Sequence, residues 1–474
     1  MLKINFFKKY YLLLVIPIII YLGLFGFGFD GLYGQDSYEY LRYANVFKNY
    51  LNTGTSPGDY FWPLYFPILG GLLDFIFNNM PFTLSLISAA SLGLSGLYCY
   101  KIIVKESEYS NKAFWYILLF LILSPSVFRL GMVAMSDMLS LNFTILSVFW
   151  SLHFSKTHKT KALYLACLFG ISAVMTRYAT FVVLLPFCVF LIYLFFKLKK
   201  SNYHIIGLLL LIIILLVPHI SLRLENSTSF LSHSWLKDWS FINFYSRTFD
   251  TQDGIANYKF PNIFYAFSNS FHPRYLFLGF VFLILFFTKS IKNKYSSLLF
   301  VSYILYSLFI AGIPFQNTRF LLLSYPFILI LLYPSYDFIC NKLQNRITIA
   351  GLLIILVLIC QISLSYIAFK PIYARNQLEQ KIAKTIKPYQ KNTLYSFDID
   401  ISLLGRQLEF DYKNLWIDTY KTIKPGSLVL FNEQKFSKQW KDKNPMLNWS
   451  FINENYTLEI IKTYNEGWVL YQIL

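Results

Sequence analysis

The chain has 474 residues and a mass of 55.7 kDa, and 56% of its residues are hydrophobic while only 14% are charged. A soluble domain usually carries about a quarter charged residues, so this composition excludes an ordinary soluble enzyme and a disordered chain. The formal net charge of +18 does not indicate nucleic-acid binding, because most of the excess lies in short loops between apolar stretches. The composition predicts an integral membrane protein.

Eleven apolar segments are predicted to cross the membrane, where a span needs about 20 largely apolar residues. They cover residues 10–28, 82–100, 113–129, 135–154, 162–177, 179–196, 204–222, 275–288, 295–313, 320–337 and 347–369. The first segment is too long for the apolar region of a typical signal peptide and lacks a small-residue cleavage site. We therefore interpret it as an uncleaved first span.

The loops between these segments alternate in charge. One set carries 17 basic and three acidic residues, whereas the other, up to residue 369, carries ten of each. The positive-inside rule therefore places the N-terminus in the cytoplasm, and an odd number of spans places the C-terminus outside. We expect the plasma membrane, which is the inner membrane of a bacterium.

The apolar stretch 63–78 breaks this alternation if it is counted as a span. Its short length, its two prolines and Asp74 favour a helix that lies at the outer surface or dips into it. It belongs to a long first outer loop, 29–81, which is predicted to carry juxtamembrane helices.

Residues 370–474 form a separate unit in this interpretation, after a transmembrane domain at 1–369. Segments 393–397, 426–431 and 458–474 are predicted to form strands, with helices between them at 401–410 and 436–449. The fold class is therefore an all-α polytopic membrane protein with a small extracytoplasmic α/β domain. This domain could dock substrate or simply cap the membrane part, and the cap is favoured slightly.

The first outer loop contains the first candidate catalytic residues, Asp36 and Glu39, in GQDSYEYLRYA (34–44). A carboxylate just beyond a span can accept the proton of an acceptor hydroxyl, as the base of a glycosyl transfer must. Asp36 could equally be a helix N-cap. The spacing alone does not separate these two interpretations.

The second candidate is Asp137, at the start of a span in SPSVFRLGMVAMSD (124–137). An ionisable residue at membrane depth is costly unless it is paired or used, which makes Asp137 a functional candidate. The alternative is capping of the helix start by Ser136 or Asp137.

Arginine is concentrated on the predicted outer side, whereas the inner loops use lysine almost exclusively. A planar guanidinium suits phosphate oxygens, although any single arginine at a helix end is more simply explained by snorkelling. Seven on one side favour an anionic ligand such as a lipid phosphate. They are Arg42, Arg129, Arg177, Arg223, Arg247, Arg274 and Arg319.

Five pieces of the sequence, in order over residues 1–335, resemble the GT-C superfamily of membrane glycosyltransferases. The similarity is to the branch containing protein O-mannosyltransferases and the aminoarabinose transferase acting on lipid A. The pieces are GQDSYEYLRYA, WPLYFPILGGLLDFIF, SPSVFRLGMVAMSD, TRYATFVVLLP and RFLLLSYP. Many relatives carry an Asp-Glu pair in the first loop, whereas here Ser37 follows Asp36.

The resemblance implies transfer of a sugar from a polyprenyl-phosphate carrier to a lipid, glycan or protein acceptor at the outer face. It implies that Asp36 is the base, with Asp137 as the second acid and Glu39 as a possible substitute. Arg177 would contact the carrier phosphate, assisted by Arg319 and Arg274. The resemblance transfers no function to 370–474.

Two other classes of function stay open: a transporter or flippase for lipid-linked saccharides, and a saccharide polymerase or ligase. No half-to-half repeat of the kind common in transporters is evident. The five cysteines form no CxxC or Cys/His pattern, so the sequence supports neither a zinc site nor a disulfide framework. No cofactor is required; a divalent metal could bridge the carboxylates and the phosphate, but no ligand cluster demands one.

Overall fold

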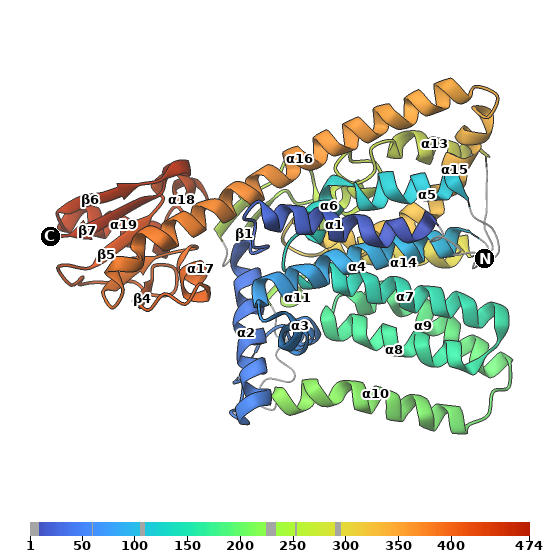
Figure 1. Ribbon diagram of the computed structural model, residues 1–474, viewed down its shortest axis with the longest axis horizontal. Helices are drawn as coiled ribbons and strands as arrows, with labels where there is room; N and C mark the ends of the chain where they lie inside the picture. Colours follow the sequence, from blue (N-terminus) through green and yellow to red (C-terminus); the bar gives the residue numbers. More distant parts are fainter. Residues whose placement is uncertain (1–8, 59, 105–109, 224–233, 252–253, 290–294) are drawn as a thin grey trace, which may run out of the picture.

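The computed structural model describes residues 9–58, 60–104, 110–223, 234–251, 254–289 and 295–474. Most of the chain is a bundle of roughly parallel helices, and a smaller α/β domain stands at one end of it (Figure 1). The helices of the bundle are α1 (Leu12–Gly26), α4 (Met80–Ile103), α5 (Asn111–Ile117), α6 (Pro125–Gly131), α7 (Ser136–Thr157), α8 (Thr160–Thr176), α9 (Thr180–Lys197), α10 (Tyr203–Leu222), α13 (Gly279–Lys289), α14 (Ser296–Ala311), α15 (Tyr325–Lys342) and α16 (Ile347–Ile386).

The bundle is that of an integral membrane protein. Within the described residues, six helices are long and apolar enough to cross a membrane, or up to seven if one bent pair forms a single span. Each of the eleven predicted spans coincides with helix, but several of these helices are short, such as α8 with 17 residues and α14 with 16. The apolar faces pack around one large core that includes residues from α1, α4, α7, α14 and α15.

Two further helices, α2 (Gly34–Thr53) and α3 (Tyr65–Phe77), cross the bundle at its end instead of running along it (Figure 1). The 13-residue α3, in the segment 63–78 that was not counted as a span, is too short to cross a membrane. Asp74 of α3 is 4% exposed and ties the neighbouring helices together. Its carboxylate accepts from Lys48 Nζ of α2 at 2.8 Å and from Thr83 Oγ1 of α4 at 3.0 Å.

The segment predicted as a span at 113–129 is broken. Helix α5 continues into a π-helical turn, η2 (Leu118–Ile122), and then bends by 71° into α6. Ser124 lies at the bend, where its hydroxyl donates to the carbonyl of Tyr275 at 2.9 Å, and Pro125 begins the new helix. The bend turns α6, which carries Arg129, toward the end of the bundle where α2 lies.

Short elements connect the second half of the bundle. They are α11 (Ser234–Lys237), η4 (Ile242–Phe244), α12 (Asn262–Phe267), η5 (Ser268–Ser270) and η6 (Thr318–Leu322), with the antiparallel hairpin β1 (Thr248–Thr251) and β2 (Gly254–Asn257). A further short element, η1 (Lys9–Tyr11), directly precedes α1.

The C-terminal domain is built on a five-stranded mixed sheet in the order β4-β3-β5-β7-β6. The strands β3, β4 and β5 are parallel to one another, whereas β7 is antiparallel to both β5 and β6. Its elements are η7 (Lys387–Tyr389), β3 (Thr393–Ser396), α17 (Asp400–Gly405), β4 (Asp411–Asn414), β5 (Leu428–Phe431), α18 (Glu433–Gln439), α19 (Asn444–Asn455), β6 (Leu458–Thr463), η8 (Asn465–Gly467) and β7 (Val469–Ile473).

The α/β character of this domain agrees with the sequence prediction, with two differences in detail. The segment 436–449 holds parts of two helices, α18 and α19, which are separated by residues 440–443, and Pro445 lies in the first turn of α19. The strand β4 was not predicted, since DYKN has no alternating apolar pattern; it pairs in parallel with β3 at the edge of the sheet.

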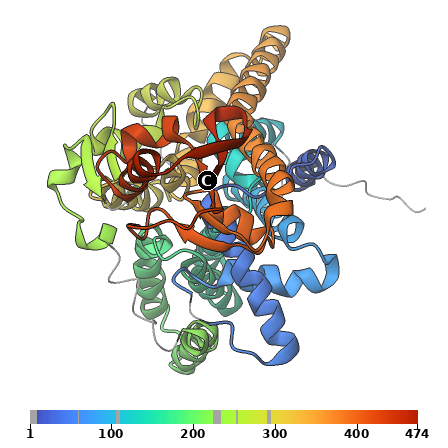
Figure 2. The same cartoon turned by 90° about the vertical axis from the view of Figure 1, so that its left-hand side faces the viewer.

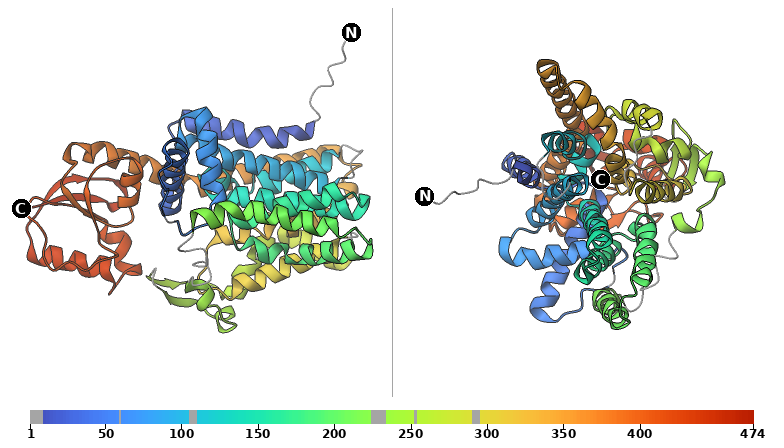
Figure 3. Two further views of the ribbon diagram at one scale, coloured as in Figure 1. Left: turned by 90° about the horizontal axis from the view of Figure 1, so that it is seen from below. Right: turned by 90° about the vertical axis from the view of Figure 1, so that its right-hand side faces the viewer.

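The long helix α16 joins the two parts without interruption (Figure 1). The predicted boundary at residue 370 falls inside it, next to Pro371. Its first half packs on the bundle core and its last turns, from Leu378 on, contribute to the separate core of the C-terminal domain. Viewed from that end, the domain lies in front of the bundle (Figure 2), and the β1–β2 hairpin lies beside it on one flank (Figure 3).

Candidate active site

Asp36 lies in the first turn of α2, at the end of the bundle that faces the C-terminal domain. The residue before the helix, Tyr33, is the N-cap and makes no side-chain capping bond, so Asp36 is not the cap. Its carboxylate instead pairs with Arg319, with Oδ2 2.5 Å from the guanidinium Nη1. The side chain of Asp36 keeps 30% of its exposure, so one face of the carboxylate stays accessible.

Asp137 lies in the first turn of α7 and is 1% exposed. Neither it nor Ser136 caps this helix through its side chain, because the N-cap is Met135. A carboxylate buried this deeply must be paired, and Asp137 contacts two guanidinium groups. It forms an ion pair with Arg177, and its Oδ2 lies 3.1 Å from Nη2 of Arg319.

Arg319 therefore joins the two candidate acids, although it lies in η6, far from both along the chain. Burial opposes its charge, but the carboxylates of Asp137 and Asp36 outweigh that effect and raise the pKa of Arg319 above its usual value. We call Asp36, Asp137, Arg177 and Arg319 the Arg319 cluster. The structure thus brings together four of the six residues predicted from the sequence.

Tyr40 explains why α2 and α7 meet at this point, and the sequence analysis did not identify it. Its buried hydroxyl lies 2.7 Å from the hydroxyl of Ser136, directly before Asp137. Tyr40 follows Asp36 by four residues, so the two side chains lie on the same face of α2. The signal in the sequence was this i, i+4 spacing between an acid and an aromatic residue, shortly after the first apolar span.

Arg129 of α6 adds a third guanidinium beside the cluster. Its Nη2 donates to Thr318, the neighbour of Arg319, at 3.4 Å. Its Nε is buried and has no hydrogen-bond partner among the described residues. With Arg129 included, three guanidinium groups face two carboxylates, so the region carries one surplus positive charge. Sequence reasoning counted Arg129 among the outer arginines without assigning it a role.

The two other candidates do not join the cluster. Glu39 pairs with Arg42 one turn further along α2, through Nε at 2.8 Å, and both side chains are partly exposed. Arg274 is exposed, and within the described residues its guanidinium makes no ion pair. The backbone carbonyl of Arg274 accepts from the amide of Ser126 at 2.8 Å, which places the residue beside the start of α6.

Comparison with solved structures identifies this arrangement of helices. The chain superposes on the crystal structure of ArnT from Cupriavidus metallidurans bound to undecaprenyl phosphate, with a TM-score of 0.59 and 11% identity over 96% of this chain and 97% of that one. The apo form of the same protein gives a TM-score of 0.55 and 10% identity over the same shares. The chain has the fold of ArnT.

ArnT is a lipid A aminoarabinose transferase of the GT-C superfamily, so the similarity to GT-C enzymes predicted from the sequence is confirmed at the level of the fold. The sequence matches no family model and no curated protein. At 10–11% identity the shared fold with ArnT does not by itself carry over any residue's role.

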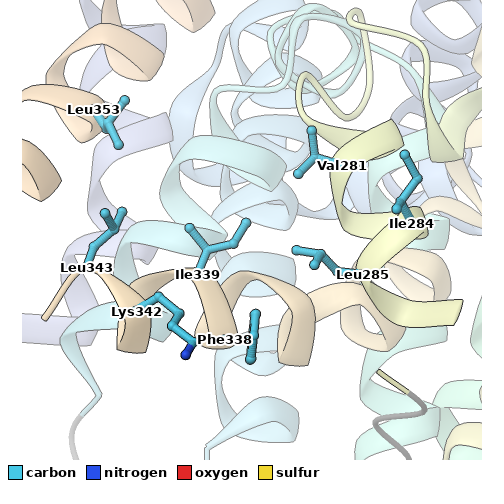
Figure 4. A pocket seen from close by; sticks show the side chains of 8 residues that line it. All are labelled: Val281, Ile284, Leu285, Phe338, Ile339, Lys342, Leu343 and Leu353. Atoms are coloured by element: carbon cyan, nitrogen blue, oxygen red, sulfur yellow. The ribbon is translucent and has the colours of Figure 1, made fainter. Parts of the chain in front are cut away.

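Two cavities of the ArnT-like bundle lie away from the Arg319 cluster. One, of about 500 Å³, is a groove between α13, α15 and α16 whose walls are apolar except for Lys342 (Figure 4). The other, of about 450 Å³, lies between α2, α3 and the segment Gly405–Gln407. Neither is lined by Asp36 or Asp137, so neither is a candidate for the acid–base chemistry.

A metal site was left open by the sequence. In the part of the chain that the structure describes, no group of three or more His, Cys, Asp or Glu side chains is placed to hold a metal ion. The two carboxylates of the Arg319 cluster are joined to each other through a guanidinium.

Proposed function

We propose that this protein is a glycosyltransferase that moves a sugar from a polyprenyl-phosphate carrier to a lipid, glycan or protein acceptor at the outer face of the membrane. One observation carries this proposal: Asp36 and Asp137, from two separate helices, meet on the guanidinium of Arg319. The ArnT fold supports it, because one crystal structure of ArnT holds undecaprenyl phosphate.

The different exposure of the two carboxylates suggests different roles. Asp36 is accessible, so it can meet an acceptor hydroxyl and take its proton. Asp137 is fully buried and held by two guanidinium groups, so it serves to orient Arg177 and Arg319. Glu39 is engaged with Arg42 and has no part in this proposal.

The guanidinium groups suit the leaving group. Polyprenyl phosphate gains negative charge as the sugar departs, and fixed cations in a water-poor site stabilise that charge by a few kcal/mol each. Arg177, Arg319 and Arg129 surround the region, and the buried Nε of Arg129, which has no hydrogen-bond partner in the described part of the chain, can donate to a phosphate oxygen. Arg274, exposed beside α6, is a further candidate.

The reaction is a direct displacement at the anomeric carbon. The acceptor oxygen forms the new bond to that carbon while the bond to the phosphate oxygen breaks, and its electron pair leaves with the polyprenyl phosphate. Asp36 takes the acceptor proton. A single displacement inverts the anomeric configuration.

The test is to incubate the purified protein in lipid nanodiscs with a panel of polyprenyl-phosphate sugars and acceptors, and to measure free polyprenyl phosphate and glycosylated product. Asp36→Asn is expected to lower turnover by about 10² to 10⁴-fold, since general-base catalysis contributes that much. The matched control is Glu39→Gln on the same helix, which is expected to keep near-normal turnover. Full activity in Asp36→Asn would reassign the base.

A second experiment distinguishes the proposed transferase from a transporter of lipid-linked saccharides. For this test the protein is reconstituted into lipid vesicles. If a labelled lipid-linked saccharide moves across the vesicle membrane, and no donor releases polyprenyl phosphate, the protein is a transporter and not a transferase.

A further inference from the structure

The C-terminal domain contacts the helix that carries Asp36 through a compact group of charged side chains. Arg406, which follows α17, donates from Nη1 to Asp30 at 2.7 Å and from Nη2 to the hydroxyl of Tyr38 at 3.0 Å. That hydroxyl donates in turn to Glu379 of α16. Arg375, one turn earlier on α16, pairs with the same carboxylate at 2.5 Å. We call these five residues the Tyr38 cluster.

The centre of the Tyr38 cluster, the hydrogen bond between Tyr38 and Glu379, is buried, whereas Asp30, Arg375 and Arg406 at its rim are partly exposed. The side chain of Glu379 is 1% exposed, and Tyr38 is 2% exposed and belongs to the core around α2, against which Ile401 of the domain also packs. A carboxylate at such a site is tolerated only while it is paired and hydrogen-bonded. Glu379 forms its ion pair with Arg375 of its own helix and accepts a hydrogen bond from Tyr38 of α2.

The position of Tyr38 on α2 connects this cluster to the proposed base. Successive residues of an α-helix are about 100° apart, so Tyr38 and Asp36 point to nearly opposite sides of α2. On the side of Asp36, Tyr40 bonds to Ser136 at the start of α7. The helix is therefore fixed on one side by the bundle and on the other by the C-terminal domain.

Close packing reinforces the hydrogen bonds. Gly405 lies against the ring of Tyr38, and a Cβ at position 405 would come within 2.6 Å of the ring atom Cδ1. The guanidinium of Arg406 lies 5.7 Å from the centre of the same ring. Rotation of α2 about its axis would break these contacts, and it would also swing the carboxylate of Asp36 away from Arg319.

We propose that Tyr38 is a positioning residue through which the C-terminal domain holds α2 so that Asp36 faces the reaction centre. The domain then contributes to catalysis indirectly, by holding α2. This role goes beyond that of a passive cap or of a docking module. The proposal rests on the function proposed above for Asp36.

The main variant is Tyr38→Phe, which keeps the ring and removes only the hydroxyl. It is expected to lower kcat about tenfold or more, because small displacements of a catalytic group are costly, while KM for the donor stays within about twofold. Gly405→Ala is an independent variant that pushes on the same ring from the domain side, and it is expected to have the same effect.

The control is Lys443→Gln, which breaks a different contact of the domain, the exposed ion pair to Asp250 of the β1–β2 hairpin at 3.0 Å. It is expected to leave kcat and KM unchanged. If the domain affected activity only through the overall stability of the protein, kcat in the three variants would correlate with their thermal unfolding temperatures and not with loss of the contact to α2.

Hydrogen–deuterium exchange of the backbone amides in 34–44 provides a measurement that does not depend on activity. Exchange there is expected to accelerate in Tyr38→Phe and Gly405→Ala, and to stay unchanged in Lys443→Gln. Unchanged exchange, or faster exchange with a normal kcat, would overturn the positioning role. Absence of transfer by the wild type with every donor would overturn the proposed function and the catalytic part of this inference together, while the exchange data would still decide whether the domain fixes α2.

Discussion

At the scale of single residues, the charge balance of the site depends on Asp137. It is buried, it pairs with both Arg177 and Arg319, and the ring of Phe320 covers Arg177 with its centre 5.4 Å from the guanidinium carbon. Nothing near Arg177 in the sequence neutralises its charge, and the structure supplies a carboxylate 40 residues away. Arg177 therefore has a structural partner and remains a proposed phosphate ligand.

Variants of Arg177 separate these two roles. Arg177→Lys keeps the charge but loses the planar fork, so it is expected to lower turnover about tenfold, whereas Arg177→Ala lowers it about 10² to 10³-fold. The measurement is thermal unfolding of wild type and both variants, with and without polyprenyl phosphate. A ligand role predicts the largest ligand-dependent stabilisation in wild type. Equal stabilisation in all three would leave Arg177 only the ion pair with Asp137.

Gly31 is the residue that allows the loop before α2 to approach the bundle. Its φ of +84° is in the left-handed region, and a Cβ would come within 1.7 Å of the Ser85 hydroxyl. Gly31→Ala is therefore expected to destabilise the fold by roughly 2 kcal/mol or more. A lowered thermal unfolding temperature checks this, with Gly34→Ala as a control because it has a positive φ of +70° but open space around it. Equal losses in both variants would show that the backbone conformation alone matters.

At the scale of elements, α2, α3 and α4 are joined by Asp74. This residue is almost fully buried, and its partner Lys48 is partly buried as well. The three helices share one hydrophobic core that includes Phe47, Phe66 and Leu84, and the buried ion pair of Asp74 with Lys48 adds a polar link between them.

Asp74→Ala is expected to destabilise the protein by about 3 kcal/mol, because it leaves a partly buried ammonium group without its carboxylate. The control is Asp411→Ala, which removes the exposed pair with Lys413 and is expected to change stability by about 0.5 kcal/mol or less. Thermal unfolding in detergent measures both. A loss in Asp74→Ala no larger than that of the control would contradict the role of this ion pair.

At the scale of the whole molecule, the two ends of the bundle are predicted to face different compartments. Lys159, between α7 and α8, is expected in the cytoplasm, and Lys424 of the C-terminal domain outside. Single cysteines at these two exposed positions, in a chain without its native cysteines, should react differently with a membrane-impermeant maleimide. Labelling of position 424 in intact cells, and of position 159 only after permeabilisation, is the expected result. Labelling of both from one side would overturn the count of eleven spans.

The stability of the C-terminal domain is expected to depend on pH through Asp400. Burial raises the pKa of this carboxyl to about 6, and the hydrogen bond from Asn414 to its Oδ2 at 2.6 Å offsets only part of that effect. Because the folded pKa exceeds the unfolded value, the folded state binds the proton more tightly. The domain therefore loses up to about 3 kcal/mol of stability as pH rises from about 4 through 6.

The variant Asp400→Asn isolates this contribution. Its stability relative to wild type is expected to increase as pH rises across that window, measured by thermal unfolding at a series of pH values. A difference that stays constant with pH, or that changes in the opposite direction, would contradict the raised pKa.

The sequence by itself determined the features that depend on solvent and on local spacing. The sequence shows apolar runs long enough for a bilayer, the lysine-rich loops, the short apolar stretch at 63–78 and the strands of the C-terminal domain other than β4, because each depends on how one segment meets water or lipid. The order of five short motifs was sufficient to predict the fold shared with ArnT. Asp36, Asp137, Arg177 and Arg319 were also identified as candidates on these grounds.

Only the tertiary structure decided which candidates lie together. Arg319 meets Asp36 across 283 residues of chain, and Tyr38 meets Glu379 across 341, so no local pattern carries either pair. Glu39 is also an acid and lies three residues from Asp36, on nearly the same face of α2, yet it pairs with Arg42 one turn further along the helix, whereas Asp36 in the first turn meets Arg319. The bend at Ser124 and the closeness of the C-terminal domain to α2 likewise arise from packing between distant segments, and that packing determines which carboxylate is accessible and which is buried.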